Sequence, residues 1–206
     1  MIYEIRTYTL RPGQIPEFEK RFEAALPTRL KYSELAAFWH TEVGPLNQVI
    51  HVWPYENLQH RTEIRARLAQ EKDWPPKAHD ILLSMKSEIF IPAPFSPKLG
   101  GGQKLGNIYE MRIYQYQPGA IPAVIERWRE ALQGGRLKLS PLAACMSSEI
   151  GQLNVWVHIW PYADLNERAR IREESRKLST WPPKTREFLV TQENKILVPA
   201  SFSPMA

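Results

Sequence analysis

The residues best suited to chemistry in this sequence are two histidines at matching positions of a repeated segment. His51 lies within NQVIHVWPY and His158 lies within NVWVHIWPY, so each is followed two residues later by a tryptophan. The chain has five histidines, and only these two recur. Histidine titrates near neutral pH and can donate or accept a proton, so either residue could act as an acid–base group. The alternative is a hydrogen-bonded interface histidine without a chemical role.

A glutamate and an arginine two residues apart form a second repeated pair. Glu4 and Arg6 stand near the start of the chain, and Glu110 and Arg112 occupy the same place in the second copy. In a strand, residues two apart share one face. The arginine could stabilise a negatively charged oxygen during a reaction. A buried Glu–Arg pair could equally set the register of an interface without taking part in chemistry.

Two arginines spaced by four residues recur as well, as Arg61 and Arg65 and again as Arg168 and Arg172. This spacing places both on one helical face. The pair could bind a carboxylate or a phosphate, or it could pair with an acidic residue such as Glu4 and attach the helix to the sheet. The other histidines are not repeated, and no spacing supplies a metal-ligand set, so we expect neither a metal ion nor a cofactor.

These repeats belong to an internal duplication of the whole chain. The segment IYEIRTY at 2–8 recurs as IYEMRIY at 108–114, an offset of 106 that becomes 107 after an insertion near Gly134 and Gly135. Similarity at a fixed period indicates two copies of one structural unit. A proline segment leading into three glycines has the composition of a linker. We therefore divide the chain into a first unit 1–98, a Gly-rich linker 99–106 and a second unit 107–206.

Each copy has the pattern of an α+β unit. In the first copy, the expected elements are strands at 2–9, 35–43, 46–53 and 87–91, helices at 14–26 and 57–70, and a short helix at 76–83. The order β-α-β-β-α-β is the ferredoxin-like pattern. Helices cover one face of such a sheet, so the other face needs a partner. We expect the units to pack sheet to sheet as an intrachain α+β barrel. This pseudo-dimer could be a monomer or form further homo-oligomers.

Strand alternation assigns the candidate residues to one face of each sheet. The more apolar face, which carries Tyr3 and Ile5 in the first strand, is expected to meet the helices, so the other face would lie between the two sheets. The expected catalytic residues there are His51, Arg6, His158 and Arg112. The expected ligand-binding residues are Glu4, Tyr8, Asn47, Trp53, Arg61, Glu110, Tyr114, Asn154, Trp160 and Arg168.

Composition is that of a globular protein, with 43% hydrophobic and 24% charged residues. No apolar run reaches membrane-spanning length, and the first residues have a strand pattern rather than that of a signal or transit peptide. We therefore expect a cytoplasmic protein without membrane insertion. The net charge of +5 is spread among acidic residues, which argues against nucleic acid as a partner. The single cysteine, Cys145, excludes an internal disulfide.

The segment GPLNQVIHVWPY at 44–55, followed by Leu58 and Arg61, resembles the NIPSNAP family. The second copy has GQLNVWVHIWPY followed by Leu165 and Arg168, and the opening YEIRTY also resembles the start of this domain. The resemblance implies the dimeric α+β barrel fold. Proteins with that fold include cofactor-independent monooxygenases, haem-degrading enzymes and lactone isomerases, and others that only bind. The resemblance therefore implies a fold more strongly than a reaction.

Two functions of different class are consistent with these patterns. The first is a protein that binds a small organic molecule between the sheets, as a cofactor-independent isomerase or monooxygenase, with a histidine as acid–base group and Arg6 or Arg112 stabilising an oxyanion. The second is a non-catalytic ligand-binding or protein-assembly module. Trp156 stands where the first copy has Val49, so we expect more room, and the working cavity, on the His51 side.

Overall fold

The computed structural model describes residues 1–206 and shows the duplicated α+β architecture expected from the sequence. The first unit consists of β1 (Ile2–Leu10), α1 (Ile15–Leu30), β2 (Ala37–Val43), β3 (Gln48–Tyr55), α2 (Leu58–Leu68) and β4 (Leu82–Pro92). The second unit repeats this order with β5 (Ile108–Tyr116), α3 (Ile121–Ala131), β6 (Ala144–Ile150), β7 (Val155–Tyr162), α5 (Leu165–Arg176) and β8 (Leu189–Pro199).

The one-residue insertion of the second copy lies directly after α3. Here α3 ends, and the segment Leu132–Arg136 forms a kinked turn in which Gly134 and Gly135 are not helical, before the short α4, Leu137–Leu139. Gly135 has φ of 106° in this turn, a conformation that glycine adopts without the strain of a Cβ atom. The insertion is therefore absorbed locally, and the strands on both sides keep the pairing of the first unit.

Local signals determine where the helices begin. Pro16 and Pro122 lie in the first turn of α1 and α3, where a backbone N–H is not needed for the helix. The side chains of Asn57 and Asp164 cap α2 and α5 by accepting a backbone N–H from the residue three positions later. Equivalent signals therefore start equivalent helices in the two units.

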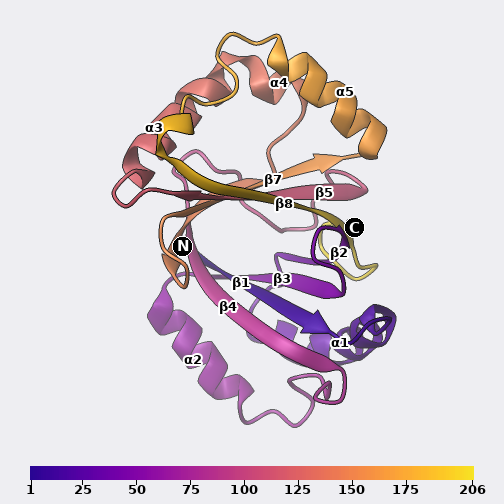
Figure 1. Ribbon diagram of the computed structural model, residues 1–206. Coiled ribbons are helices and arrows are strands. Elements are labelled where there is room, and N and C mark those ends of the chain that lie inside the picture. Colours follow the sequence, from indigo (N-terminus) through magenta and orange to yellow (C-terminus); the bar gives the residue numbers. More distant parts are fainter.

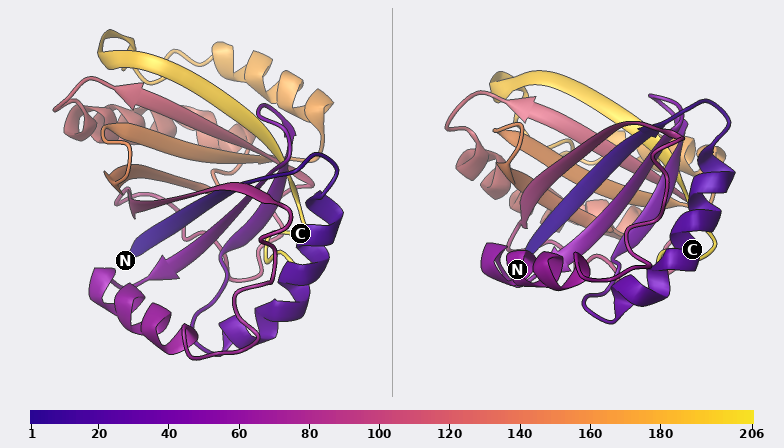
Figure 2. Two further views of the ribbon diagram at one scale, coloured as in Figure 1. Left: turned by 60° about the horizontal axis from the view of Figure 1, so that its bottom comes forward. Right: turned by 90° about the horizontal axis from the view of Figure 1, so that it is seen from below.

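The eight strands close into one barrel in the order β1-β3-β2-β8-β5-β7-β6-β4. Each unit supplies four strands, and the units join where β2 pairs with β8 and where β4 pairs with β6. The two sheets lie back to back, with α1 and α2 outside one sheet and α3, α4 and α5 outside the other (Figure 1). Two other views show the same outer position of the helices (Figure 2). The expected intrachain α+β barrel is confirmed.

The barrel interior is filled by apolar side chains, which corrects the expected assignment of the strand faces. Tyr3, Ile5, Ile50 and Val52 point inward with their second-unit counterparts and form one buried cluster. The opposite face, with Glu4 and His51, lies under the helices instead. On the helix side of the sheet, Arg61 of α2 pairs with the buried carboxylate of Glu4, whereas the inward face is filled mainly by the apolar cluster. The inter-sheet ligand cavity that we expected is therefore wrong.

The segment before the last strand differs from expectation. No helix forms at 76–83, because β4 already begins at Leu82 and pairs with β1 over almost its whole length. In the second unit only a short 3-10 turn, Arg186–Phe188, precedes β8. A helix of one or two turns is marginal by itself, so the longer ladder of strand hydrogen bonds prevails.

The tail of each unit packs against the other unit. Phe202, from the end of the chain, lies against Phe22 and Phe38 of the first unit with ring centroids 5.8 and 4.9 Å apart. The Ser203 hydroxyl oxygen accepts the backbone N–H of Phe38 at 3.0 Å. The equivalent Phe95 packs on the core of the second unit. The two helix layers are thus each completed by the other half of the chain.

Candidate functional site

In the first unit, Glu4 is the centre of a polar network between the sheet and the helices. Its Oε1 accepts hydrogen bonds from Arg6 at 2.9 Å, Arg61 at 2.8 Å and Ser87 at 2.6 Å, and its Oε2 accepts from Tyr55 at 3.2 Å. Burial raises the pKa of Glu4, but the hydrogen bonds from Arg61 and Ser87 and the charge of Arg6 outweigh it and hold this pKa at about 2. The network ties β1, β3, β4 and α2 together and leaves no free carboxylate oxygen.

In the second unit, Glu110 has the same network with one contact fewer. Its Oε1 accepts hydrogen bonds from Arg112 at 2.9 Å, Arg168 at 2.6 Å and Asn194 at 3.1 Å. Its Oε2 is buried and has no hydrogen-bond partner. Burial raises the pKa of Glu110, and the two arginines more than offset this, so the group stays ionised. An acceptor oxygen is therefore unused here.

Each repeated histidine is held by the tryptophan that follows it. Trp53 Nε1 donates to His51 Nδ1 at 2.6 Å, and Trp160 Nε1 donates to His158 Nδ1 at 2.7 Å. An indole N–H can only donate, so Nδ1 must be the acceptor and the proton lies on Nε2. Nε2 of each histidine is buried without a partner. The histidines are therefore hydrogen-bond donors at Nε2, which differs from the acid–base role considered above.

The charge state of His158 supports this assignment. Burial, followed by the positive charges of Arg112, Arg136 and Arg172, holds the pKa of His158 well below its ordinary value of 6.5. Protonation of Nδ1 would also break the bond from Trp160. The ring is thus neutral at physiological pH. A neutral imidazole N–H can polarise a carbonyl oxygen or stabilise an oxyanion.

A buried arginine that the sequence analysis did not select lies beside each tryptophan. The guanidinium of Arg136 lies 3.9 Å from the ring centroid of Trp160, and that of Arg29 lies 4.1 Å from the ring of Trp53. Arg136 donates to the Ser140 hydroxyl at 2.9 Å, and its Nε is buried without a partner. An arginine four residues before a serine recurs in both copies, as Arg29 and Arg136, and this repeat was the signal that could have identified the pair.

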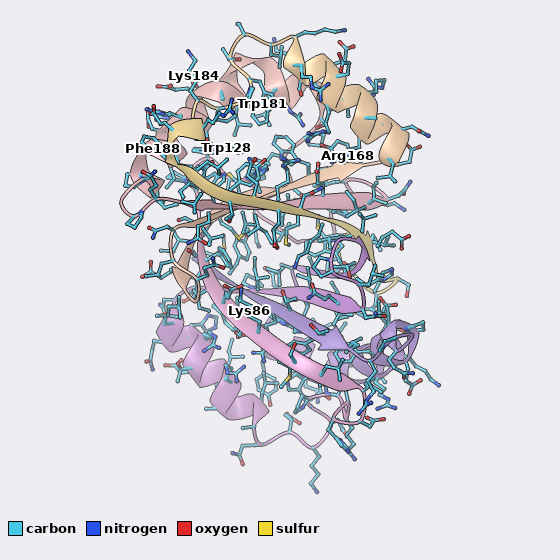
Figure 3. All side chains as sticks on the ribbon, viewed as in Figure 1. Lys86, Trp128, Arg168, Trp181, Lys184 and Phe188 are labelled. Atoms are coloured by element: carbon cyan, nitrogen blue, oxygen red, sulfur yellow. The ribbon has the colours of Figure 1, made fainter.

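A cavity of about 570 Å³ lies beside His158, between the sheet and the helices of the second unit. Trp128 and Trp181, which belong to its wall, lie in this layer (Figure 3). The wall also contains the unpartnered groups of the site, namely those of Glu110, Trp128, Arg136 and His158. Arg172 of α5 lines the cavity as well and forms no ion pair with an acidic side chain. The cavity therefore combines aromatic surface with uncompensated polar groups.

The cavity lies on the opposite side from the one expected. Trp156 does not fill the space beside His158, because its ring packs against Trp128, with the ring centroids 5.5 Å apart. The expectation that the larger residue would close this half and leave the working cavity beside His51 is therefore wrong. Comparing the sizes of two strand residues could not reveal which neighbour each would contact.

Two substitutions change the surroundings of His158 relative to those of His51. Beside His51, the ring of Phe38 stacks at 5.9 Å between centroids, and the second unit has Cys145 at that position. Leu68 at the end of α2 is buried in the first core, and its counterpart is Ser175, which lines the cavity. Ser175 opens the wall of the cavity, whereas Trp128 lies beside His158 with ring centroids 4.3 Å apart and Cys145 does not line the cavity.

The candidate residues divide into two groups in the structure. Most of them gather in the two networks, but Asn47 and Asn154 do not. Both asparagines occupy hairpin turns with φ of 57°, a left-handed conformation that asparagine tolerates. The backbone carbonyl oxygen of each accepts from the N–H at the end of the neighbouring first strand. Their repetition is explained by the turn.

Two further properties of the structure concern metals and membranes. No three or more His, Cys, Asp or Glu side chains are grouped in a way that could hold a metal ion. None of the helices combines the length and the apolar character that a membrane crossing requires.

Fold and site together define a tandem α+β barrel protein with a polar, helix-covered site in each half. The NIPSNAP family model matches residues 3–97 and again residues 109–204, so this chain belongs to the NIPSNAP family. Human NipSnap homolog 3A is 34% identical over 214 residues, covering 100% of this chain and 86% of the relative. The NipSnap homolog of Dictyostelium discoideum is 31% identical over 211 residues, covering 96% and 87%.

Two solved structures are similar to this chain. A NIPSNAP domain protein from Burkholderia xenovorans is 33% identical and covers 48% of this chain and 100% of its own, with a TM-score of 0.46. A protein from Lactobacillus acidophilus, which its name assigns provisionally to the monooxygenases, is 13% identical and covers 96% and 92%, with a TM-score of 0.69. At this identity the second likeness concerns the fold alone.

Proposed function

We propose that the second unit binds a small organic molecule in the cavity between its sheet and its helices. The observation that carries this proposal is the presence, in a cavity of about 570 Å³, of two buried residues with unused hydrogen-bonding atoms, His158 Nε2 and Glu110 Oε2. An unsatisfied buried polar atom costs free energy, typically about 1–3 kcal/mol. A ligand that supplies both partners would recover that cost. The first unit, where Glu4 has partners on both oxygens, serves as the scaffold half.

The chemistry of the site favours binding over proton transfer. His158 already carries its proton on Nε2, and the pKa of Glu110 is held below its usual range, so neither group is a strong base near neutral pH. What the site offers is stabilisation of negative charge by His158 and Arg112. A cofactor-independent isomerase or monooxygenase could use that stabilisation, but only with a substrate that ionises readily. A non-catalytic ligand-binding module is therefore the function that we favour.

The test is to fill the cavity with a residue that the first unit already accommodates. Ser175→Leu places the counterpart Leu68 at the end of α5, and leucine is a good helix former, so the fold should be retained. A fragment library of neutral, cationic and anionic compounds is screened by ligand-observed NMR. We expect binders to the natural protein and to the control Ser175→Ala, and none of them to Ser175→Leu. Binding that Ser175→Leu leaves unchanged would place the ligand elsewhere and overturn the proposal.

A further inference from the structure

The charge of the second-unit cavity points to the class of its ligand. Five arginines line the cavity, and Glu110 is the only acidic residue of the cavity wall. The carboxylate of Glu110 already forms ion pairs with Arg112 and Arg168, so it does not pair with the other arginines of the cavity wall. Arg172 in particular has no acidic partner, and burial together with the like charges of Arg112 and Arg168 lowers its pKa. Arg172 is thus a partly buried cation that forms no ion pair, and such a group in a cavity wall indicates a site for an anion.

The first unit shows that this excess of positive charge is specific to the cavity. Arg65, the counterpart of Arg172, is exposed to solvent. Arg176 and Arg186, at the cavity, stand where the first unit has Ala69 and His79. The second unit therefore has arginine at two positions around the cavity where the first unit has none, while both sheets carry the same Glu–Arg pair.

The unused hydrogen-bonding atoms require a second feature of the ligand. His158 Nε2 and Trp128 Nε1 are donors, so they need acceptor atoms on the ligand, as Arg172 does. Glu110 Oε2 is the one unused acceptor and needs a donor. A protonated amine would be repelled by the arginines, whereas a hydroxyl group can donate without carrying positive charge. The walls formed by Trp128, Trp160 and Trp181 favour a flat ring.

We propose that the cavity of the second unit binds an aromatic hydroxy acid. The carboxylate is held by Arg172, the ring lies among the tryptophans, and the hydroxyl group donates to Oε2 of Glu110. This inference rests on the proposed function, because it names the ligand class for the same cavity. Arginine suits this task since its planar guanidinium can donate two parallel hydrogen bonds to one carboxylate.

The experiment measures the affinity of the whole protein for matched probes by isothermal titration calorimetry. The probes are the three hydroxybenzoate isomers, benzoate, which lacks the hydroxyl, and phenol, which lacks the carboxylate. We expect the best isomer to bind at least tenfold more tightly than either benzoate or phenol. Arg172→Gln should weaken that isomer at least tenfold and leave phenol within twofold. Arg65→Gln, the same substitution in the first unit, should change neither.

The outcomes separate this inference from the proposed function. If phenol binds as tightly as the best isomer and Ser175→Leu abolishes both, the cavity binds ligands but the acid class is wrong. If no hydroxybenzoate binds, the inference is overturned, and the fragment screen alone decides whether the cavity takes any ligand. If Arg172→Gln leaves the affinity for hydroxybenzoate unchanged, the carboxylate is held elsewhere and the assignment of Arg172 fails.

Discussion

Trp160 donates its indole N–H to Nδ1 of His158 at 2.7 Å, and this single bond determines what the histidine can do. It places the imidazole proton on Nε2 and opposes a second proton. The same relationship joins Trp53 to His51 at 2.6 Å, so the duplication has preserved the tautomer in both units. The units differ in the surroundings of the histidine ring: His158 lines the cavity, whereas the ring of Phe38 stacks on His51.

The histidines predict a dependence of stability on pH. Burial lowers the pKa of both His51 and His158 well below 6.5. Below about pH 6.5 the unfolded chain binds protons on these residues and the folded chain does not, so the free energy of unfolding should fall as the pH decreases. The slope should reach about 1.4 kcal/mol per pH unit for each histidine.

Urea unfolding between pH 7.5 and 5, repeated with the His51→Gln and His158→Gln variants, measures this slope. Each substitution should flatten it, and ¹⁵N NMR of the natural protein should show both rings neutral with the proton on Nε2. A free energy that is level across this range would contradict the buried, neutral state of the rings.

Glu4 should be essential for stability. Glu4→Gln leaves Arg6 and Arg61 without their shared countercharge in a site where the carboxylate was 1% exposed. Removing one partner of a buried ion pair typically costs about 3–5 kcal/mol, and we expect a loss near the lower end because both arginines reach solvent. Because the pKa of Glu4 is about 2, this stabilisation should be present above pH 4.5 and be lost as the pH falls through 2.

Equilibrium urea unfolding at pH 7 compares Glu4→Gln with Glu173→Gln, which removes an exposed ion pair with Arg176. The second substitution should leave the free energy of unfolding nearly unchanged. Equal effects of the two substitutions would show that the Glu4 network does not hold the unit together.

Arg172→Gln should stabilise the protein in the absence of ligand. The charge of Arg172 is partly buried beside Arg112 and Arg168 and has no acidic partner, so its removal relieves repulsion. The melting temperature of the variant should rise, while Arg65→Gln, on the exposed counterpart, should leave it unchanged. A lower melting temperature for Arg172→Gln would mean that Arg172 supports the fold. Residues retained at a cost in stability are common in binding sites.

Phe202→Ala should destabilise the first unit even though the residue belongs to the second. Its ring packs on Phe22 and Phe38, and truncation of a packed phenylalanine costs about 3–5 kcal/mol when fully buried. Phe202 is half-buried, so we expect about 2 kcal/mol. Scanning calorimetry should show one transition at a lower temperature, because the shared barrel couples the halves. Two separate transitions would contradict this coupling.

The amino-acid sequence by itself determined the duplication, the order of elements and the barrel. The segment IYEIRTY and its second copy fix the repeat, and each unit has one sheet face that its own helices cannot cover. The recurring Glu4, Arg6 and His51 were also visible as residues that share a strand face, because side chains alternate along a strand. These features depend on local periodicity, which a sequence displays directly.

Only the tertiary structure decided which face of the sheet meets the helices. Apolar content pointed one way, but the pairing of Arg61 with Glu4 across the helix layer placed the polar face there. The same limit applied to the cavity. Its wall contains Ser175 where the first unit has Leu68, and Ser175 joins His158 and Trp128, which are distant in sequence, only after folding. The free volume and the net charge of a site depend on all the side chains that meet there after folding. The periodicity of a strand or a helix does not show which side chains those are.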